Sequence, residues 1–222
     1  MSTMPGKLTA PVRRAGHVRE DRRRAIVARL APALEELLGQ GAIYSDLSVA
    51  QLGRAAGISR SRFYVYFEDT GDLLRALTED AVVELFEATL AWWALPPDGT
   101  WSDLRVVTER IFSTYLRHRH LLTAVEQVAT YDSTVRQHFS SLFNAALKGY
   151  STELARAQAD GALDPSLEAQ RTARLLASLT QSGLYELTAT GRLDDPDPWI
   201  DSLTTIVWHN LYAAVHDAPE HA

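Results

Sequence analysis

The sequence predicts an all-α protein of about nine helices, and three observations favour this fold class. Apolar residues recur at three- and four-residue steps over long stretches, as they do along one face of a helix. Glycine and proline clusters separate these stretches. The alternation of apolar and polar residues that marks a strand is absent, so helices alone account for the pattern.

The first predicted helix follows a short arm. Residues 1–18 contain scattered glycine, proline and arginine without an apolar period, which predicts a flexible segment. The apolar period begins near Arg19, and Gly39 and Gly41 end it. Pro32 is expected to bend or destabilise this helix, because proline lacks the backbone N–H of a helical residue.

Two short helices are expected next, joined by a tight turn. Ser48 is a suitable N-cap, with Gln51 three residues later to complete a capping box. Gly57 supplies the turn and Ser59 caps the second helix. A longer helix should then begin near Asp72, and further helices are expected over 101–117, 120–130, 132–159, 165–190 and 197–216 after a break at 96–99.

The charge of the chain is unevenly distributed. Residues 1–67 hold 11 basic and 5 acidic residues, a net charge of +6, whereas residues 68–222 hold 11 basic and 23 acidic residues, a net charge of −12. A basic head on an acidic body suggests that one end of the protein meets a polyanion. An ordinary basic tail is the alternative explanation.

Composition excludes several classes of site and location. The chain has no cysteine, which rules out disulfides and thiolate chemistry. Neither a signal peptide nor an apolar run of membrane-spanning length is visible, so we expect a cytoplasmic protein without a membrane partner. No catalytic, phosphate-binding or dinucleotide motif occurs, and we expect no enzyme activity, cofactor or bound metal.

The stretch 47–67 has the layout of a helix-turn-helix. At 100° per residue, Phe63 and Phe67 share the inner face of the second helix. The outer face carries Ser61, Arg62 and Val65, with the two tyrosines on its flanks and Arg60 in its first turn. Arginine can donate two hydrogen bonds to guanine, valine can contact a thymine methyl group, and tyrosine can donate to phosphate. The constellation predicts a DNA-reading helix; a polar, solvated helix end is the alternative.

Residues 47–67, LSVAQLGRAAGISRSRFYVYF, with DLLRAL at 72–77, closely resemble the DNA-binding domain of the TetR family of regulators. The ending DSLTTIVWHNLYA resembles the branch that contains the mycobacterial ethionamide-resistance repressor. The resemblance implies an all-helical homodimer, paired through its last two helices. It also implies a DNA-binding domain over 19–70 and an effector-binding and dimerisation domain over 71–217.

The resemblance also assigns roles to residues of the motif. Base-reading positions fall at Arg60, Ser61 and Arg62, phosphate-contacting aromatics at Tyr64 and Tyr66, and a backbone contact at Ser48. The predicted DNA-binding residues are therefore Ser48, Ser59, Arg60, Ser61, Arg62, Tyr64, Val65 and Tyr66. One position departs from the family pattern. Thr70 stands where a lysine usually contacts phosphate, and we expect arginines near the N-terminus to compensate, namely Arg13, Arg14, Arg19, Arg22, Arg23 and Arg24.

The C-terminal body is rich in aromatic residues, and part of this set falls on helices that resemble the family's pocket-forming ones. We expect a mostly apolar pocket for a small lipophilic effector, with a few polar groups that orient it. Its predicted lining is Trp101, Phe112, Tyr115, Phe139, Phe143, Asn144, Thr180, Gln181 and Trp208. Apolar and small residues on the last two helices predict the dimer surface, namely Leu175, Ala177, Ser178, Leu179, Gly183, Leu203, Ile206, Val207 and Leu211.

The sequence therefore predicts a sequence-specific transcriptional regulator that binds a palindromic operator in double-stranded DNA. A repressor released by its effector is the family's usual mode, and a ligand-responsive activator is the alternative. A helical enzyme is a rival from another class, for which His118, His120 and Glu126 are the candidate residues. His118 and His120 are two residues apart and point to different faces of a helix, unlike an i, i+4 metal pair. A sequence-tolerant nucleic-acid binder is a second rival.

Overall fold

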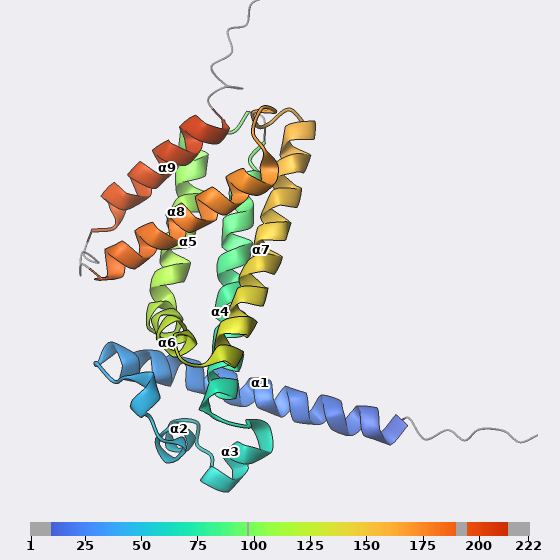
Figure 1. The fold of residues 1–222 in the computed structure, drawn as a ribbon, viewed down its shortest axis with the longest axis vertical. Coiled ribbons are helices and arrows are strands. Elements are labelled where there is room, and N and C mark those ends of the chain that lie inside the picture. The colour runs from blue at the N-terminus through green and yellow to red at the C-terminus, as the bar shows by residue number, and fades with distance from the viewer. Residues whose placement is uncertain (1–9, 97, 190–194, 213–222) are drawn as a thin grey trace, which may run out of the picture. The chain divides into compact units, whose positions relative to one another are not determined.

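The computed structural model describes residues 10–96, 98–189 and 195–212. These residues form nine α-helices and two short 3₁₀ helices without a strand, which confirms the all-α prediction (Figure 1). The α-helices are α1 (Ala10–Gly39), α2 (Val49–Ala55), α3 (Arg60–Tyr66), α4 (Thr70–Leu90), α5 (Trp101–Arg117), α6 (Arg119–Ala129), α7 (Ser133–Ala159), α8 (Ala169–Ala189) and α9 (Asp197–Leu211). The 3₁₀ helices are η1 (Tyr44–Asp46) and η2 (Ala91–Trp93).

Helix α1 corrects one expectation about the N-terminal region. It begins at Ala10, so residues 10–18 are helical rather than a flexible arm, and the rest of the predicted arm, residues 1–9, lies outside the described residues. Alanine and arginine are good helix formers, and Pro11 lies in the first turn, where its missing N–H costs nothing. The helix also continues through Pro32, and a bend or a loss of stability at this residue stays a prediction.

The other boundaries lie close to the predicted ones because local signals specify them. Helix α5 shows why: Thr100 accepts a hydrogen bond from the N–H of Asp103 at 3.2 Å. The carboxylate of Asp103 in return accepts the N–H of Thr100 at 2.9 Å. This capping box makes Thr100 the N-cap, so the helix begins at Trp101. The last helix was predicted to extend to residue 216, but residues 213–216 lie outside the described part of the chain. Pro97, in the predicted break at 96–99, lies outside it as well.

The chain forms two compact units that do not follow the sequence order. The first takes its described residues from 1–78 and 120–136, and the second from 79–119 and 137–222. Most of α6 thus belongs with the N-terminal helices, which sequence periodicity could not show. The functional boundary at residue 70 or 71 stays a prediction.

Large apolar side chains fill the core of each unit. In the first unit Leu30 and Leu34 of α1 and Phe63 of α3 are each at most 1% exposed. In the second unit Trp92 is fully buried, and its indole N–H donates to the Thr108 hydroxyl at 3.1 Å. The Tyr212 hydroxyl donates to the carbonyl of Trp92, which ties the end of α9 to η2.

Helices α5, α8 and α9 pack together in the second unit, and Figure 1 shows α8 and α9 running side by side. Arg105 on α5 joins α9 through Asp201 at 2.7 Å and Asp197 at 3.0 Å. Within the described ranges, none of the helices has the length and apolar character needed to cross a membrane.

Candidate nucleic-acid interface

The helix-turn-helix is built by two N-caps and two glycines. Ser48 caps α2 with Gln51 as its capping-box partner, and Ser59 caps α3, as predicted. Gly57 has a φ of 66°, the left-handed conformation that the turn requires. Sequence reasoning missed Gly53, at which an added Cβ would lie 2.8 Å from the carbonyl oxygen of Ile58. A side chain at this position would push the turn away from α2.

The inner face of α3 agrees with the helical-wheel prediction for two residues and differs for a third. Phe63 and Phe67 are each 1% exposed, and their ring centroids lie 5.3 Å apart. Tyr66 is also buried, at 7% exposure, whereas we expected it on a flank of the helix. The reason is its place three residues after Phe63, which puts its ring on the same face. Little of the Tyr66 side chain is therefore exposed for the predicted phosphate contact.

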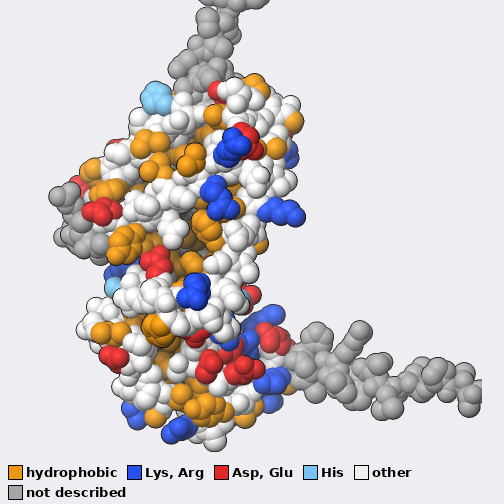
Figure 2. All heavy atoms as spheres, in the orientation of Figure 1, with side chains coloured by type: hydrophobic (Ala, Val, Ile, Leu, Met, Phe, Trp, Pro, Cys, Tyr) orange, Lys and Arg blue, Asp and Glu red, His pale blue; other side chains and the backbone are white. Residues whose placement is uncertain are grey.

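The outer face of α3 brings the other predicted residues together. Arg60, Ser61 and Arg62 are exposed at the N-terminal end of the helix. Tyr64 and Val65 follow with exposures of 50% and 53%. Figure 2 shows basic side chains beside hydrophobic ones at the end of the first unit formed by α2 and α3. This face offers two guanidinium groups, a hydroxyl and apolar surface within seven residues, groups of the kinds that can contact base edges.

All three predicted serines already have hydrogen-bond partners within the motif. The N–H and the hydroxyl of Ser48 both donate to the side-chain oxygen of Gln51, at 2.9 and 2.7 Å. The Ser59 hydroxyl accepts the N–H of Arg62 at 3.2 Å and lies 3.0 Å from the Ser61 hydroxyl. A phosphate contact by Ser48 would therefore replace its capping hydrogen bond with Gln51.

Thr70, which stands where the family pattern has a lysine, is the first residue of α4. Asp69 accepts the N–H of Asp72 at 2.6 Å and so caps the helix with an acidic group. The carbonyl of Thr70 accepts the hydroxyl of Tyr44 at 2.5 Å. Burial, with a smaller contribution from the charge of Asp69, raises the pKa of Tyr44, which keeps this donor protonated. Thr70 thus anchors its backbone to η1, and the helix start is acidic.

The arginines that we expected to contact phosphate divide into three groups. The side chains of Arg13 and Arg14 lie outside the described residues. Arg22 and Arg24 are exposed. Arg19, although exposed, donates to the Val65 carbonyl of α3 at 2.8 Å, and Arg23 donates to the Asp72 carboxylate of α4 at 2.7 Å. That residues so far apart in sequence meet could not be predicted from local pattern.

The predicted effector-pocket residues lie in different environments of the second unit. Phe112, Tyr115 and Thr180 are buried, whereas Asn144 and Gln181 are exposed. The others, Trp101, Phe139, Phe143 and Trp208, are half-buried. The Thr180 hydroxyl donates to the Leu176 carbonyl at 2.7 Å, so its hydrogen is used in a bond within α8. Trp208 stacks on Tyr212 with ring centroids 5.5 Å apart.

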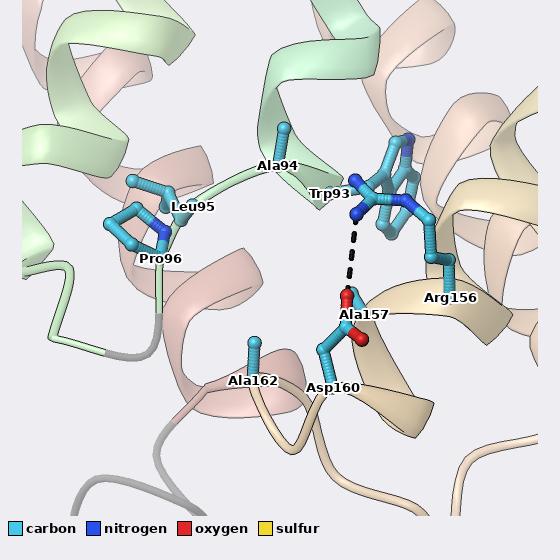
Figure 3. Close-up of a pocket in the computed structure, with 8 residues that line it drawn as sticks. All are labelled: Trp93, Ala94, Leu95, Pro96, Arg156, Ala157, Asp160 and Ala162. Carbon is cyan, nitrogen blue, oxygen red and sulfur yellow. Dashed lines mark hydrogen bonds and ion pairs between the residues drawn. The ribbon is translucent and has the colours of Figure 1, made fainter.

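Two cavities of the second unit are described, and the predicted pocket residues line neither. One, of about 210 Å³, is bounded by η2 and the end of α7 (Figure 3). Its lining is Trp93, Ala94, Leu95, Pro96, Arg156, Ala157, Asp160 and Ala162. The Arg156 guanidinium and the Asp160 carboxylate pair at 3.3 Å at its edge. The other, of about 330 Å³, lies between α4 and α7 and is lined by Phe86, Leu90, Ala145, Lys148, Gly149, Thr152 and Glu153.

The histidines considered for an enzyme have structural partners. His118 Nε2 lies 2.9 Å from the carboxylate of Glu84, which Arg117 also contacts. Together the two partners, His118 first, hold the pKa of Glu84 below its usual value. The backbone N–H of His120 donates to the carboxylate of Glu35 at 2.8 Å. Among the described residues, histidines and carboxylates do not form a group of three that could hold a metal ion.

Comparison with known proteins identifies the fold. Neither a protein-family model nor a curated protein matches the sequence. Solved structures do. A protein from Mesorhizobium loti, described as a TetR-family transcriptional regulator, superposes with a TM-score of 0.69 at 14% identity, covering 87% of this chain and 98% of its own. A TetR-family regulator from Streptomyces coelicolor gives 0.62 at 20% identity, covering 89% and 81%.

A third similar structure is a transcriptional regulator from Saccharomonospora viridis in complex with choline. Its TM-score is 0.66 at 15% identity, and the match covers 87% of this chain and 98% of that one. The resemblance to the branch of the ethionamide-resistance repressor stays a prediction. The chain has the fold of the TetR-family transcriptional regulators.

Proposed function

We propose that this protein is a sequence-specific DNA-binding transcriptional regulator that binds its operator as a homodimer. The observation that carries the proposal is the exposed face of α3, where Arg60 and Arg62 stand at the N-terminal end of a helix with a buried aromatic back. Recognition helices of helix-turn-helix proteins contact base edges with this end. The positive charge of residues 1–67 adds a sequence-independent attraction to phosphate.

Selection from a random pool of duplex DNA tests the proposal. We expect one sequence to be enriched, bound about 10³-fold or more tightly than random duplex. Replacing both Arg60 and Arg62 by alanine should abolish that preference. Arg29→Ala, which removes an exposed arginine of α1, is the matched control and should keep it. Enrichment of no sequence would favour the sequence-tolerant binder, and enrichment without any effect of the α3 variants would assign recognition to another surface.

The homodimer is supported by unpartnered apolar side chains on the last two helices. Leu175 is 70% exposed, Leu179 43% and Ile206 41%, and an added Cβ at Gly183 would meet open space. The other apolar residues of the predicted surface, Leu203, Val207 and Leu211, are buried within the chain itself. A two-fold dimer would place two α3 helices about 34 Å apart, one turn of DNA.

Sedimentation of the wild-type protein and of Leu175→Asp tests the dimer. The wild type should sediment as a dimer and the variant as a monomer with an unchanged helical spectrum, because Leu175 contributes little to the core of its own subunit. Val106→Asp is the control, since Val106 on α5 is exposed at 66% but lies outside the proposed surface. Dimers in both variants would exclude Leu175 from the interface.

The regulatory part of the proposal is a small lipophilic effector that releases a repressor from DNA. Support comes from the aromatic-rich second unit, its two cavities and a protein of similar fold that binds choline. A ligand that binds one dimer state more tightly shifts the population toward that state. Thermal shifts with apolar compounds and with choline, followed by operator titration, test this. A ligand that strengthens operator binding would favour an activator or co-repressor mode.

A further inference from the structure

Arg23 of α1 is enclosed against the DNA-reading motif. One of its terminal nitrogens lies 2.7 Å from the Asp72 carboxylate, and its guanidinium carbon lies 5.3 Å from the centre of the Phe67 ring. Its side chain is 27% exposed, and its Nε is buried without a hydrogen-bond partner. Little of this guanidinium is therefore accessible to a DNA phosphate.

Asp72 connects Arg23 to the segment that joins α3 to α4, because its carboxylate contacts both. Its second carboxylate oxygen accepts the backbone N–H of Glu68 at 3.1 Å, directly after the last residue packed behind α3. A terminal nitrogen of Arg75 lies 3.4 Å from the same Asp72 oxygen that Arg23 contacts. The Asp72 side chain is 17% exposed, so solvent screens the pair with Arg23 only in part.

A second arginine of α1 binds the end of the recognition helix. Arg19 donates to the Val65 carbonyl at 2.8 Å, near the C-terminus of α3. A cation at this end is favourable because helix carbonyls leave a partial negative charge there. Helix α1 therefore holds α3 at its C-terminal end and again at the connection that follows it.

We infer that Arg23 and Asp72 are positioning residues that set the orientation of α3 for operator recognition, and that Arg23 does not act as a phosphate contact. The inference rests on the proposed DNA-binding function. The pair acts through Phe67 and the Glu68 backbone, which together fix where the exposed face of α3 points. Asp72 contributes to DNA affinity although it is acidic, because its carboxylate holds Arg23 and the Glu68 backbone, which align α3.

Variants of the two residues distinguish positioning from electrostatic attraction. Arg23→Met and Arg24→Met each remove one positive charge from α1, but Arg24 is exposed, and its Nε lies 3.5 Å from the carboxylate of Glu20 on the same helix. The measurement is the affinity of each full-length variant for the selected operator duplex and for a scrambled duplex, over a range of salt concentrations. Thermal unfolding of each variant, in parallel, shows whether it is folded at the assay temperature.

We expect Arg23→Met to weaken operator binding about tenfold or more, with the scrambled duplex affected no more than by Arg24→Met. The dependence of log affinity on log salt should not become shallower, whereas loss of a phosphate contact would reduce that slope by about 0.9. A shallower slope with equal losses on both duplexes would overturn the inference.

For Asp72→Asn, a role through charge and a role in positioning predict opposite changes in operator affinity. If Asp72 acted only through its charge, its removal would strengthen binding to any DNA. Positioning predicts weaker operator binding with scrambled-duplex affinity unchanged or raised. Stronger or unchanged operator binding would contradict the inference. If Arg23→Met is unfolded, Arg23→Lys carries the same comparison, since it keeps the charge and loses the planar contact with Phe67.

Failure of the inference is distinct from failure of the proposed function. If the wild-type protein selects no operator, the proposed function is wrong before any variant is compared. If it selects an operator and the Arg23 and Asp72 variants recognise it as the wild type does, only the positioning role is wrong.

Discussion

The carboxylate of Glu35 binds the N-terminus of a helix that begins more than eighty residues later. Its two oxygens accept the backbone N–H groups of His120 at 2.8 Å and Leu121 at 2.9 Å. These N–H groups belong to the first turn of α6, where a helix has no internal acceptors for them. An acid from α1 thus caps α6 within the first compact unit.

Glu35→Gln should lower the free energy of unfolding by about 1–2 kcal/mol, because the amide offers one acceptor and no charge to the helix end. Urea unfolding near neutral pH measures this. Glu36→Gln is the matched control: Glu36 is exposed, and the contact of its carboxylate is a 3.2 Å hydrogen bond from Gln40 on the same helix. Equal effects of the two substitutions would show that the cap on α6 contributes nothing.

Phe63→Ala should destabilise the protein by about 3–5 kcal/mol, since it removes a ring that is 1% exposed from the core behind α3. Tyr64→Ala removes a neighbouring ring that is 50% exposed and should change stability by about 0.5 kcal/mol or less. The Tyr64 variant should instead weaken DNA binding through the lost outer-face contact. Comparable destabilisation by both would mean that α3 does not pack as described.

Glu84→Gln should destabilise the protein near neutral pH and have little effect in acid. The hydrogen bond from His118, with a further contribution from Arg117, lowers the pKa of Glu84 in the folded state. The unfolded chain then binds the proton more readily, so the wild type loses this stabilisation as the pH falls through the folded pKa. Melting temperatures of both proteins from pH about 7 to about 3 should converge. A constant difference would contradict the assignment.

Gly149→Ala should destabilise the second unit, because an added Cβ would lie 2.6 Å from the Cζ atom of Phe86. The Phe86 ring packs on Tyr150 with centroids 5.0 Å apart, and we expect a net loss of about 1 kcal/mol. Gly183→Ala, on α8 with open space around the new methyl group, should instead stabilise a monomeric chain by about 0.5–1 kcal/mol. A gain at both positions would show that Phe86 moves aside freely.

Local features of the sequence predicted the helix caps, the turn and the buried face of α3, because each depends on residues only a few positions apart. The capping serines at 48 and 59, the turn at Gly57 and the buried pair Phe63 and Phe67 all follow from spacing within a few positions. Tyr66 shows the limit of a helical wheel, which gives an angle but not the depth of the packed face. The charge of the N-terminal arginines was visible, but not which of them face solvent.

Contacts between distant segments could not be predicted in this way. Arg23 meets Asp72 across 49 positions, and Glu35 meets Leu121 across 86. Such pairs depend on how helices cross, for which a single sequence holds no periodic signal. The environments of the polar residues of the predicted effector pocket could not be predicted for the same reason. Asn144 and Gln181 proved to be exposed, although their helices were expected at nearly the right bounds.

The central claim is that α3 reads DNA sequence, and the affinity ratio between the selected duplex and a scrambled duplex tests it most directly. At about 0.15 M salt, the wild type should prefer its selected duplex by about 10³-fold or more. Replacing Arg60 and Arg62 by alanine should bring this ratio close to one while the protein stays folded. A ratio near one for the wild type, or a ratio that survives in the double variant, would contradict the claim.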